Sequence, residues 1–289
     1  MKLTGELLAI LSSIFIGISV PIAVVASREI GVFQVTAYTS LLSVIFLVAL
    51  SIIAREKIQF KKALTKYFKY SISIVIARPI IGSLLLIYGF SLTTAIHSSF
   101  MMRLEPIFVT TMSYIFLKDK VSLKQISLII LMIIGAFLLS TSGSIELITQ
   151  TQIGDLFVIL SLLFFSYAYI PAKKIGKEIN PMTITIVNNL IGGFALFLIM
   201  LFLPINPLSV NFDNAWLLFG FVFSFSVIGL YLYFAALRKT KPWIVSSLLS
   251  LSAVVGAAIG YFWLNETINS IQILGAFIIL ISSYLIAKK

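Results

Sequence analysis

Hydrophobic residues form long, nearly continuous stretches along this chain, and short polar or basic segments separate each stretch from the next. Each stretch is near the length of about 20 residues at which an α-helix crosses a bilayer. The connections between them are too short to hold a soluble domain. With proline and charged residues as boundaries, the pattern predicts ten membrane-spanning helices, at about 4–27, 33–54, 71–92, 95–117, 122–142, 153–173, 181–203, 215–237, 242–264 and 270–287.

The composition agrees with an all-α integral membrane protein. Hydrophobic residues make up 60% of the chain and charged residues 11%, whereas a soluble domain carries roughly 25% charged residues. The net charge of +11 can indicate a nucleic-acid partner, but the basic residues lie in the short connections between spans. Membrane topology accounts for them, so we expect a lipid bilayer and no nucleic acid as partner. The chain has no cysteine, which excludes disulfides and thiolate chemistry.

The positions of the basic residues also predict the orientation. Of the 21 Lys and Arg residues, only Arg28 falls in a connection on the opposite side, and only Arg78 and Arg103 fall within spans. Connections rich in Lys and Arg remain in the cytoplasm, so we expect both termini to be cytoplasmic. The Ile-, Lys- and Phe-rich composition points to a prokaryote, and therefore to the plasma membrane.

The second half of the chain repeats features of the first half. Gly5-Glu6-Leu7 opens the first predicted span, and Gly154-Asp155-Leu156 opens the sixth. Tyr88 and Leu92 have counterparts in Tyr233 and Leu237, and these matches keep the same order in both halves. The pattern predicts two five-helix repeats, at 1–145 and 150–289.

Loop charge indicates that the second repeat is inverted. The Lys-rich connection at 55–69 corresponds to 204–214, which contains no Lys or Arg. Equivalent connections differ in charge when they face opposite sides of the membrane. We therefore predict ten transmembrane helices as two inverted five-helix repeats, an arrangement typical of secondary transporters. The alternative is chance similarity between leucine-rich helices.

One segment of each half resembles the signature of a known family. The sequence SSFMMRLEP at 98–106, followed by an apolar run that ends in LKD at 117–119, resembles the EamA-type signature of the drug/metabolite transporter superfamily. The sequences SSLLSL at 246–251 and WLNE at 263–266 resemble its second copy. The resemblance covers nearly the whole chain.

This resemblance implies a central cavity lined mainly by the first, third, fourth, sixth, eighth and ninth spans, with alternating access to the two sides. It also implies substrates such as amino acids, related metabolites or drugs. The chain departs from the family pattern at Arg103, where a small or apolar residue is more usual, and at Ser252-Ala253, which replace Glu105-Pro106 in the second copy. The first departure points to an unusual, anionic substrate.

Three charged residues lie within predicted spans: Arg78, Arg103 and Glu105. A charge at the centre of a span costs about 2.5–3.5 kcal/mol, so such residues normally face the bundle interior and are candidates for substrate binding. Arg103 and Glu105 are two positions apart and point to different helix faces. We therefore predict an Arg78–Glu105 ion pair, with Arg103 free to contact substrate. The alternative is that these charges only join the third and fourth spans.

Prolines mark the predicted hinges. Pro21 and Pro171 fall near the far ends of the first and sixth spans, and matching breaks in two repeats point to a transporter site. Pro106 removes a backbone donor within the fourth span and is expected to bend it. Kinks tolerated for packing are the alternative for Pro21 and Pro171.

Polar and aromatic residues complete the predicted binding site. Tyrosine offers an apolar face and a hydroxyl, which suits a pocket for amphipathic metabolites. Tyr88 and Tyr233, near span ends, are instead expected at the membrane interface. The residues expected to bind substrate beside the charged ones are Tyr167, Tyr169, Tyr231, Ser247 and Ser250.

The function predicted from these features is secondary transport of a small metabolite by alternating access. An intramembrane enzyme is the first alternative, but the chain has no Gly-x-Ser-x-Gly, His-Glu-x-x-His or phosphate-cradling motif, so we expect no catalytic residues, metal or cofactor. A channel is the second, but repeated polar filter loops are absent. Proton coupling through Glu105, the direction of transport and the oligomeric state stay open, although two halves in one chain suffice for a monomer.

Overall fold

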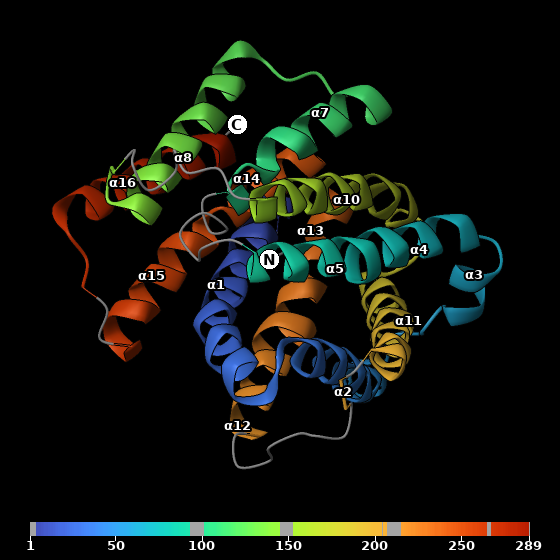
Figure 1. The fold of residues 1–289 in the computed structure, drawn as a ribbon. Helices are drawn as coiled ribbons and strands as arrows, with labels where there is room; N and C mark the ends of the chain where they lie inside the picture. The colour runs from blue at the N-terminus through green and yellow to red at the C-terminus, as the bar shows by residue number, and fades with distance from the viewer. Residues whose placement is uncertain are drawn as a thin grey trace.

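The computed structural model describes residues 4–92, 101–144, 153–203, 205–206, 215–264 and 267–288. Within these ranges the regular structure is helical throughout (Figure 1). The helices before residue 145, called here the first half, are α1 (Gly5–Ile30), α2 (Val32–Ile53), α3 (Phe60–Leu64), α4 (Phe68–Val75), η1 (Ile76–Gly82), α5 (Ser83–Ser91), α7 (Glu105–Leu117) and α8 (Leu123–Thr141). Those after residue 152, the second half, are α10 (Ile153–Ile175), α11 (Pro181–Phe202), α12 (Ala215–Phe221), η3 (Val222–Gly229), α13 (Leu230–Lys239), α14 (Pro242–Leu249), α15 (Leu251–Leu264) and α16 (Ser270–Ala287).

Within the described residues, every hydrophobic stretch singled out in the sequence contains a helix or consecutive helical segments, although residues 95–100 of the fourth stretch lie outside that part of the chain. Among the described residues, eight helices are long and apolar enough to cross a membrane. Two shorter apolar helices, Gly5–Ser19 and Glu105–Leu117, fall in the first and fourth predicted spans. The chain is therefore a helical, multi-pass membrane protein.

Side-chain caps fix the beginnings of α8 and α16. Ser122 accepts a hydrogen bond from the Gln125 backbone N–H, and the Gln125 side chain accepts one from the Ser122 N–H, at the start of α8. Asn269 and Gln272 form the same reciprocal pair at the start of α16. Each pair satisfies backbone donors that an uncapped helix end leaves without a partner.

Two helices widen into π-helical segments, which the hydrophobic pattern did not predict. η1 connects α4 to α5, and η3 connects α12 to α13. Pro79 lies inside η1, where its ring cannot donate a backbone hydrogen bond. π-Helical turns are rare and occur frequently at functional sites.

The expected interruptions at Pro21 and Pro171 do not occur, since α1 and α10 both continue as α-helices through these residues. A single proline removes one backbone hydrogen bond, and the bonds on either side maintain the helix. Pro106 lies in the first turn of α7, where no intrahelical donor is needed. The ninth span is interrupted at Ser250 instead, between α14 and α15.

The helices of the two halves interlock. α1 packs against η3, α13, α14 and α15 of the second half, while α10 packs against α4, η1, α5 and α7 of the first half. The remaining long helices pair across the halves, α2 with α11 and α8 with α16, on two sides of the molecule (Figure 1). α1 and α10 therefore occupy the centre of the bundle.

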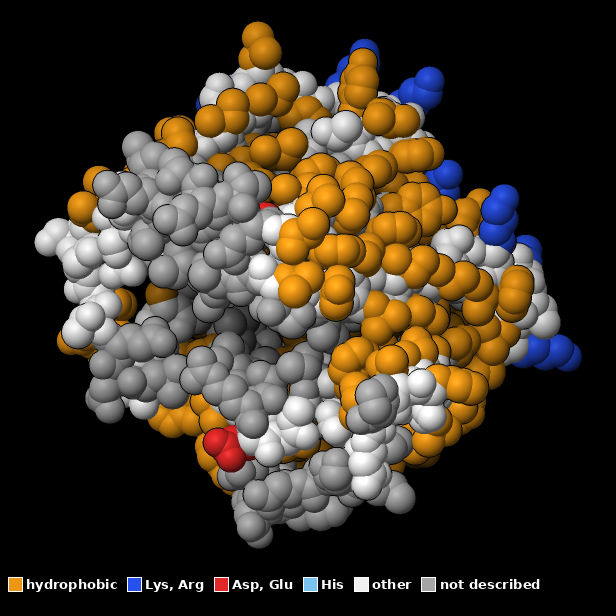
Figure 2. Space-filling model, in the orientation of Figure 1, with side chains coloured by type: hydrophobic (Ala, Val, Ile, Leu, Met, Phe, Trp, Pro, Cys, Tyr) orange, Lys and Arg blue, Asp and Glu red, His pale blue; other side chains and the backbone are white. Residues whose placement is uncertain are grey.

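The outer surface is strongly apolar. Figure 2 shows a broad hydrophobic face, with Lys and Arg side chains gathered along one margin of the molecule. Large exposed apolar residues follow α8 and α16, among them Ile130, Leu131, Phe277 and Leu280. In a soluble protein such a surface would aggregate, but in a membrane it contacts lipid chains.

Candidate functional site

The centre of the bundle holds a cluster of charged and aromatic side chains, called here the charged cluster, which consists of Arg78, Arg103, Glu105, Tyr169 and Tyr233. Its members come from η1, the segment before α7, α7 itself, α10 and α13. Both halves of the chain therefore contribute to it.

Arg78 extends from η1 toward the second half of the chain. Its Nη1 donates a hydrogen bond to the Tyr233 hydroxyl at 3.3 Å. Its Cζ lies 4.6 Å from the centre of the Tyr233 ring and 5.7 Å from that of the Phe165 ring. A guanidinium over an aromatic face is stabilised by the ring quadrupole, which partly replaces the water that this charge has lost.

Two tyrosines form the aromatic wall of the charged cluster. Tyr169 and Tyr233 are both 0% exposed, and their rings meet edge to face with centroids 5.1 Å apart. The Glu105 carboxylate and the Tyr169 hydroxyl lie close enough to interact, but no hydrogen bond of 3.5 Å or less joins them. The Tyr169 hydroxyl is thus a buried donor without a hydrogen-bond partner among the described residues.

Arg103 and Glu105 stand at the point where α7 begins. Glu105 is in the first turn of α7, where the positive end of the helix dipole favours a carboxylate. Arg103 Nη1 donates a hydrogen bond to Ser252 Oγ of α15 at 3.4 Å. Its Nε is buried and has no partner in the described part of the chain.

The predicted Arg78–Glu105 ion pair is not formed within 4.0 Å, although the two charges interact electrostatically at longer range. Tyr233 contacts the Arg78 guanidinium instead, through both its hydroxyl and its ring. Arg103 is also less free than expected, because it bonds to Ser252. The charges therefore connect the two halves of the chain as well as spans within one half.

The remaining predicted site residues lie outside the charged cluster. Tyr167 is 37% exposed and meets the edge of Phe116 on α7, with ring centroids 6.3 Å apart. Ser247 is buried and donates to the Trp243 carbonyl within its own helix at 2.8 Å. Ser250 forms the interruption of the ninth span. Their roles in binding stay predictions.

Tyr231 also lies apart from the charged cluster. It is half-buried and interacts electrostatically with Glu56 and Arg238. Residues 98–100 and 265–266 of the family signature lie outside the described residues.

Sequence reasoning missed two members of the site. Tyr233 was expected at the membrane interface, but the span continues to Lys239, so Tyr233 lies about 9 Å from its end and is fully buried. Phe165 carried no signal, because it is one of 24 phenylalanines. The match between Tyr88 and Tyr233 in the two halves gave both residues the same expected position. In the structure they differ, since Tyr88 is 54% exposed and Tyr233 is buried.

The charged cluster is suited to bind an anion. Two arginines, which stay protonated in proteins, face a single carboxylate, so at least one positive charge is not compensated inside the charged cluster. The Tyr169 hydroxyl and Arg103 Nε add two buried donors that have no hydrogen-bond partner within the described ranges. Buried polar groups normally have hydrogen-bond partners, so these donors indicate a place for a ligand acceptor. Among the described residues, no three His, Cys, Asp or Glu side chains group as metal ligands.

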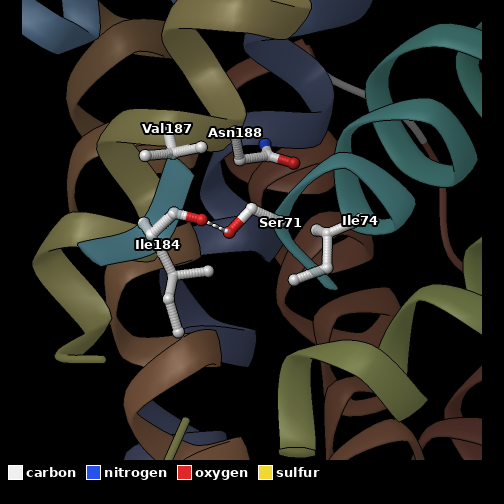
Figure 3. Close-up of a pocket in the computed structure, with 6 residues that line it drawn as sticks. Ser71, Ile74, Ile184, Val187 and Asn188 are labelled. Carbon is white, nitrogen blue, oxygen red and sulfur yellow. Dashed lines mark hydrogen bonds between the residues drawn. The ribbon is translucent and has the colours of Figure 1, made fainter. Parts of the chain in front are cut away.

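Apart from the charged cluster, a small space lies between α3, α4 and α11 (Figure 3). Its volume is about 10 Å³, which is the size of one water molecule and far too small for a metabolite. Asn188 points into it, and its Oδ1 has no partner among the described residues, while its Nδ2 donates to Asn189 Oδ1 at 3.2 Å. Asn189 in turn donates to Ser43 Oγ at 2.7 Å, which joins α11 to α2. This space is a packing feature between helices.

Comparison with known proteins agrees with this architecture. An uncharacterized transporter of Methanothermobacter thermautotrophicus is 26% identical over 302 residues, which cover 99% of this chain and 86% of that protein. The uncharacterized transporter YyaM of Bacillus subtilis is 26% identical over 67% of this chain and 64% of its own length. A WAT1-related chloroplastic protein of Arabidopsis thaliana is 27% identical over 46% of this chain and 33% of its own length.

A solved crystal structure superimposes with a TM-score of 0.82 over 98% of this chain and 96% of that chain, and its sequence identity of 11% means that the likeness concerns the fold alone. The model of the EamA-like transporter family matches residues 3–141 and again residues 152–288. These two matches cover nearly all of the sequence and confirm the resemblance seen in it. The chain therefore belongs to the EamA-like transporter family and is a membrane transporter.

Proposed function

We propose that this protein is a secondary transporter that moves a small anionic metabolite, such as an acidic amino acid, across the membrane by alternating access. The observation that carries the proposal is the charged cluster, in which Arg78 and Arg103 outnumber Glu105 at the meeting point of the two halves. An anion bound there would compensate the excess positive charge and accept hydrogen bonds from donors that lack partners.

We further propose that the chain crosses the membrane ten times, as two inverted five-helix repeats. Matched features support this arrangement: the family model fits twice, and both fifth helices begin with reciprocal side-chain caps. π-Helical segments also occur at equivalent places, in η1 and η3. In addition, α1 packs on the third and fourth helices of the other half, and α10 does the same in return.

Contacts on one face support alternating access. Lys62 of the first half pairs with Glu178 of the second at 3.6 Å, and Lys241 pairs with Asp119 at 3.8 Å. Thr240 donates a hydrogen bond to Glu6 at 2.9 Å. All three join the halves on the face that carries the Lys-rich connections, which we propose is cytoplasmic, with the protein in the plasma membrane and both termini inside. These contacts would have to separate when the protein opens to that side.

Proton coupling through Glu105 is part of the proposal, because this carboxylate is the one acidic group of the charged cluster. A proton on Glu105 would change the charge that the site offers to an anion, which is how a proton gradient and substrate binding become linked. Since one chain supplies both halves of the charged cluster, we propose that a monomer suffices for transport.

Uptake into proteoliposomes tests this function. The purified protein would be offered radiolabelled glutamate, alanine and lysine in turn, with and without a pH gradient. We expect saturable uptake of glutamate that exceeds that of alanine and lysine, with stimulation by the gradient. Preference for lysine, or uptake that does not saturate, would contradict an anion carrier.

A further inference from the structure

The connection between α2 and α4, which contains α3, forms an open groove at one end of the bundle. The groove has a volume of about 460 Å³ and is lined by Ile58, Gln59, Lys61, Lys62, Thr65 and Lys66. We call it the basic groove. None of the residues that line the basic groove belongs to the charged cluster, so the two are different sites.

Positive charge accumulates in the basic groove. The Nζ atoms of Lys62 and Lys66 lie 5.6 and 5.5 Å from the centre of the same Tyr67 ring, which holds these like charges together. Glu178 approaches from the second half, 3.6 Å from Lys62. The nearby Tyr67 hydroxyl and the Lys62 ammonium lower the pKa of Glu178, so this carboxylate is ionised at neutral pH. One carboxylate against three lysines leaves the basic groove with an excess of positive charge.

Apolar side chains at the ends of the two helices that flank the basic groove along the chain face outward. Ile52 and Ile53, at the end of α2, are 72% and 78% exposed, and Phe68, at the start of α4, is 53% exposed. The flanking helices contain the candidate spans Phe33–Ile53 and Phe68–Leu86, so the basic groove lies where two spans leave the membrane. Figure 2 shows basic side chains along the margin that α3 and α4 occupy in Figure 1, next to the hydrophobic face.

From this juxtaposition we infer that the basic groove binds the headgroup of an anionic phospholipid, while the acyl chains lie along the exposed apolar end of α2 and Phe68. Lysine binds phosphate as a point charge, and basic residues next to a span attract acidic lipids. The groove is open, so a headgroup enters it without any change in the helices. This inference requires the membrane location alone and is independent of the transported substrate.

Native mass spectrometry of the full-length protein in detergent tests the site. Dioleoylphosphatidylglycerol and dioleoylphosphatidylcholine would be added in equal amounts, so that only the headgroups differ. The groove variant is Lys61→Gln/Lys66→Gln; Lys62 is kept because it pairs with Glu178. The matched control is Lys120→Gln/Lys124→Gln, which removes two exposed lysines at the start of α8.

We expect wild type and control to retain phosphatidylglycerol in preference to phosphatidylcholine, and the groove variant to lose about fivefold of that preference per lysine. Lys61→Arg/Lys66→Arg, which keeps the charge, should retain the preference and shows that the altered positions still fold. Inorganic phosphate in tenfold excess over lipid should not displace the phosphatidylglycerol, because it lacks acyl chains. An unchanged preference in the groove variant, an equal loss in the control, or displacement by phosphate would overturn the inference.

Discussion

At the scale of single residues, the sequence identified charges but could not identify their partners. Arg78, Arg103 and Glu105 stand out in any reading, because ionisable groups within spans are costly. Tyr169 was also expected near them, and the structure brings all four together with Tyr233. What the sequence could not supply is side-chain direction. Helix periodicity indicates a face, but a long guanidinium reaches several neighbours, and here it reaches Tyr233 before Glu105.

Arg103 provides the first test at this scale. Replacement by alanine removes the unpartnered Nε and one of the two positive charges, so we expect the KM for glutamate uptake to rise by at least about tenfold. Ser252→Ala removes only the 3.4 Å hydrogen bond to Arg103 and should raise KM less than about fivefold. The measurement is initial uptake rate against glutamate concentration in proteoliposomes. Equal kinetics for wild type and Arg103→Ala would exclude contact between Arg103 and the substrate.

The two buried tyrosines provide a second test, because removing each hydroxyl has a different consequence. Tyr233→Phe deletes the acceptor of the Arg78 hydrogen bond and should destabilise the protein by about 1–3 kcal/mol. Tyr169→Phe deletes a hydroxyl that forms no hydrogen bond of 3.5 Å or less among the described residues, so we expect stability to fall less than in Tyr233→Phe while glutamate uptake falls. Thermal unfolding in detergent and uptake would be measured on both. The reverse order of stabilities would show that Tyr169 has the structural role.

At the scale of helices, the positions of the spans followed from the sequence and their irregularities did not. Hydrophobic length and flanking charge located α2, α11 and α16 within a few residues of their observed bounds. The π-helical segments add a residue to a turn without changing the run of apolar side chains, so no pattern of hydrophobicity reveals them. The helix break at Ser250 was not predicted either, because the surrounding segment consists of small and apolar residues and contains no proline or glycine that would indicate a break. Conversely, prolines that looked like breaks in α1 and α10 are tolerated.

The crossing of α8 and α16 provides the test at this scale. A Cβ added at Gly275 would lie 2.6 Å from the Leu139 backbone nitrogen, and one added at Gly135 would lie 2.8 Å from the Gly275 carbonyl oxygen. Both approaches are to backbone atoms, so the helices must separate to admit a side chain. We expect Gly275→Leu to lower stability by about 1–3 kcal/mol, measured as thermal unfolding in detergent. Phe277→Leu on the lipid-exposed side of α16 is the control, and an equal loss there would argue against a specific crossing.

At the scale of the whole molecule, the contacts between halves gather on the face with the Lys-rich connections. Besides the pairs of Lys62 with Glu178 and Lys241 with Asp119, the Thr240 hydroxyl donates a hydrogen bond to the Glu6 carboxylate at 2.9 Å, which joins the end of α13 to the start of α1. Loop charge predicted an orientation from the same residues. It could not predict their pairing, because the partners lie far apart in the sequence and meet only when both bundles are assembled.

The natural absence of cysteine allows a direct test of movement at this face. Lys62→Cys/Glu178→Cys places two thiols where an ion pair of 3.6 Å now joins the halves, and a short bifunctional methanethiosulfonate reagent would bridge them. We expect bridging to abolish glutamate uptake and a reductant to restore it, because alternating access requires the halves to separate here. Lys120→Cys/Lys124→Cys lies within one half, with Lys120 just before α8 and Lys124 in its first turn, and the same reagent should leave its uptake unchanged. Undiminished uptake by the bridged Lys62→Cys/Glu178→Cys protein would mean that this face stays closed throughout the cycle.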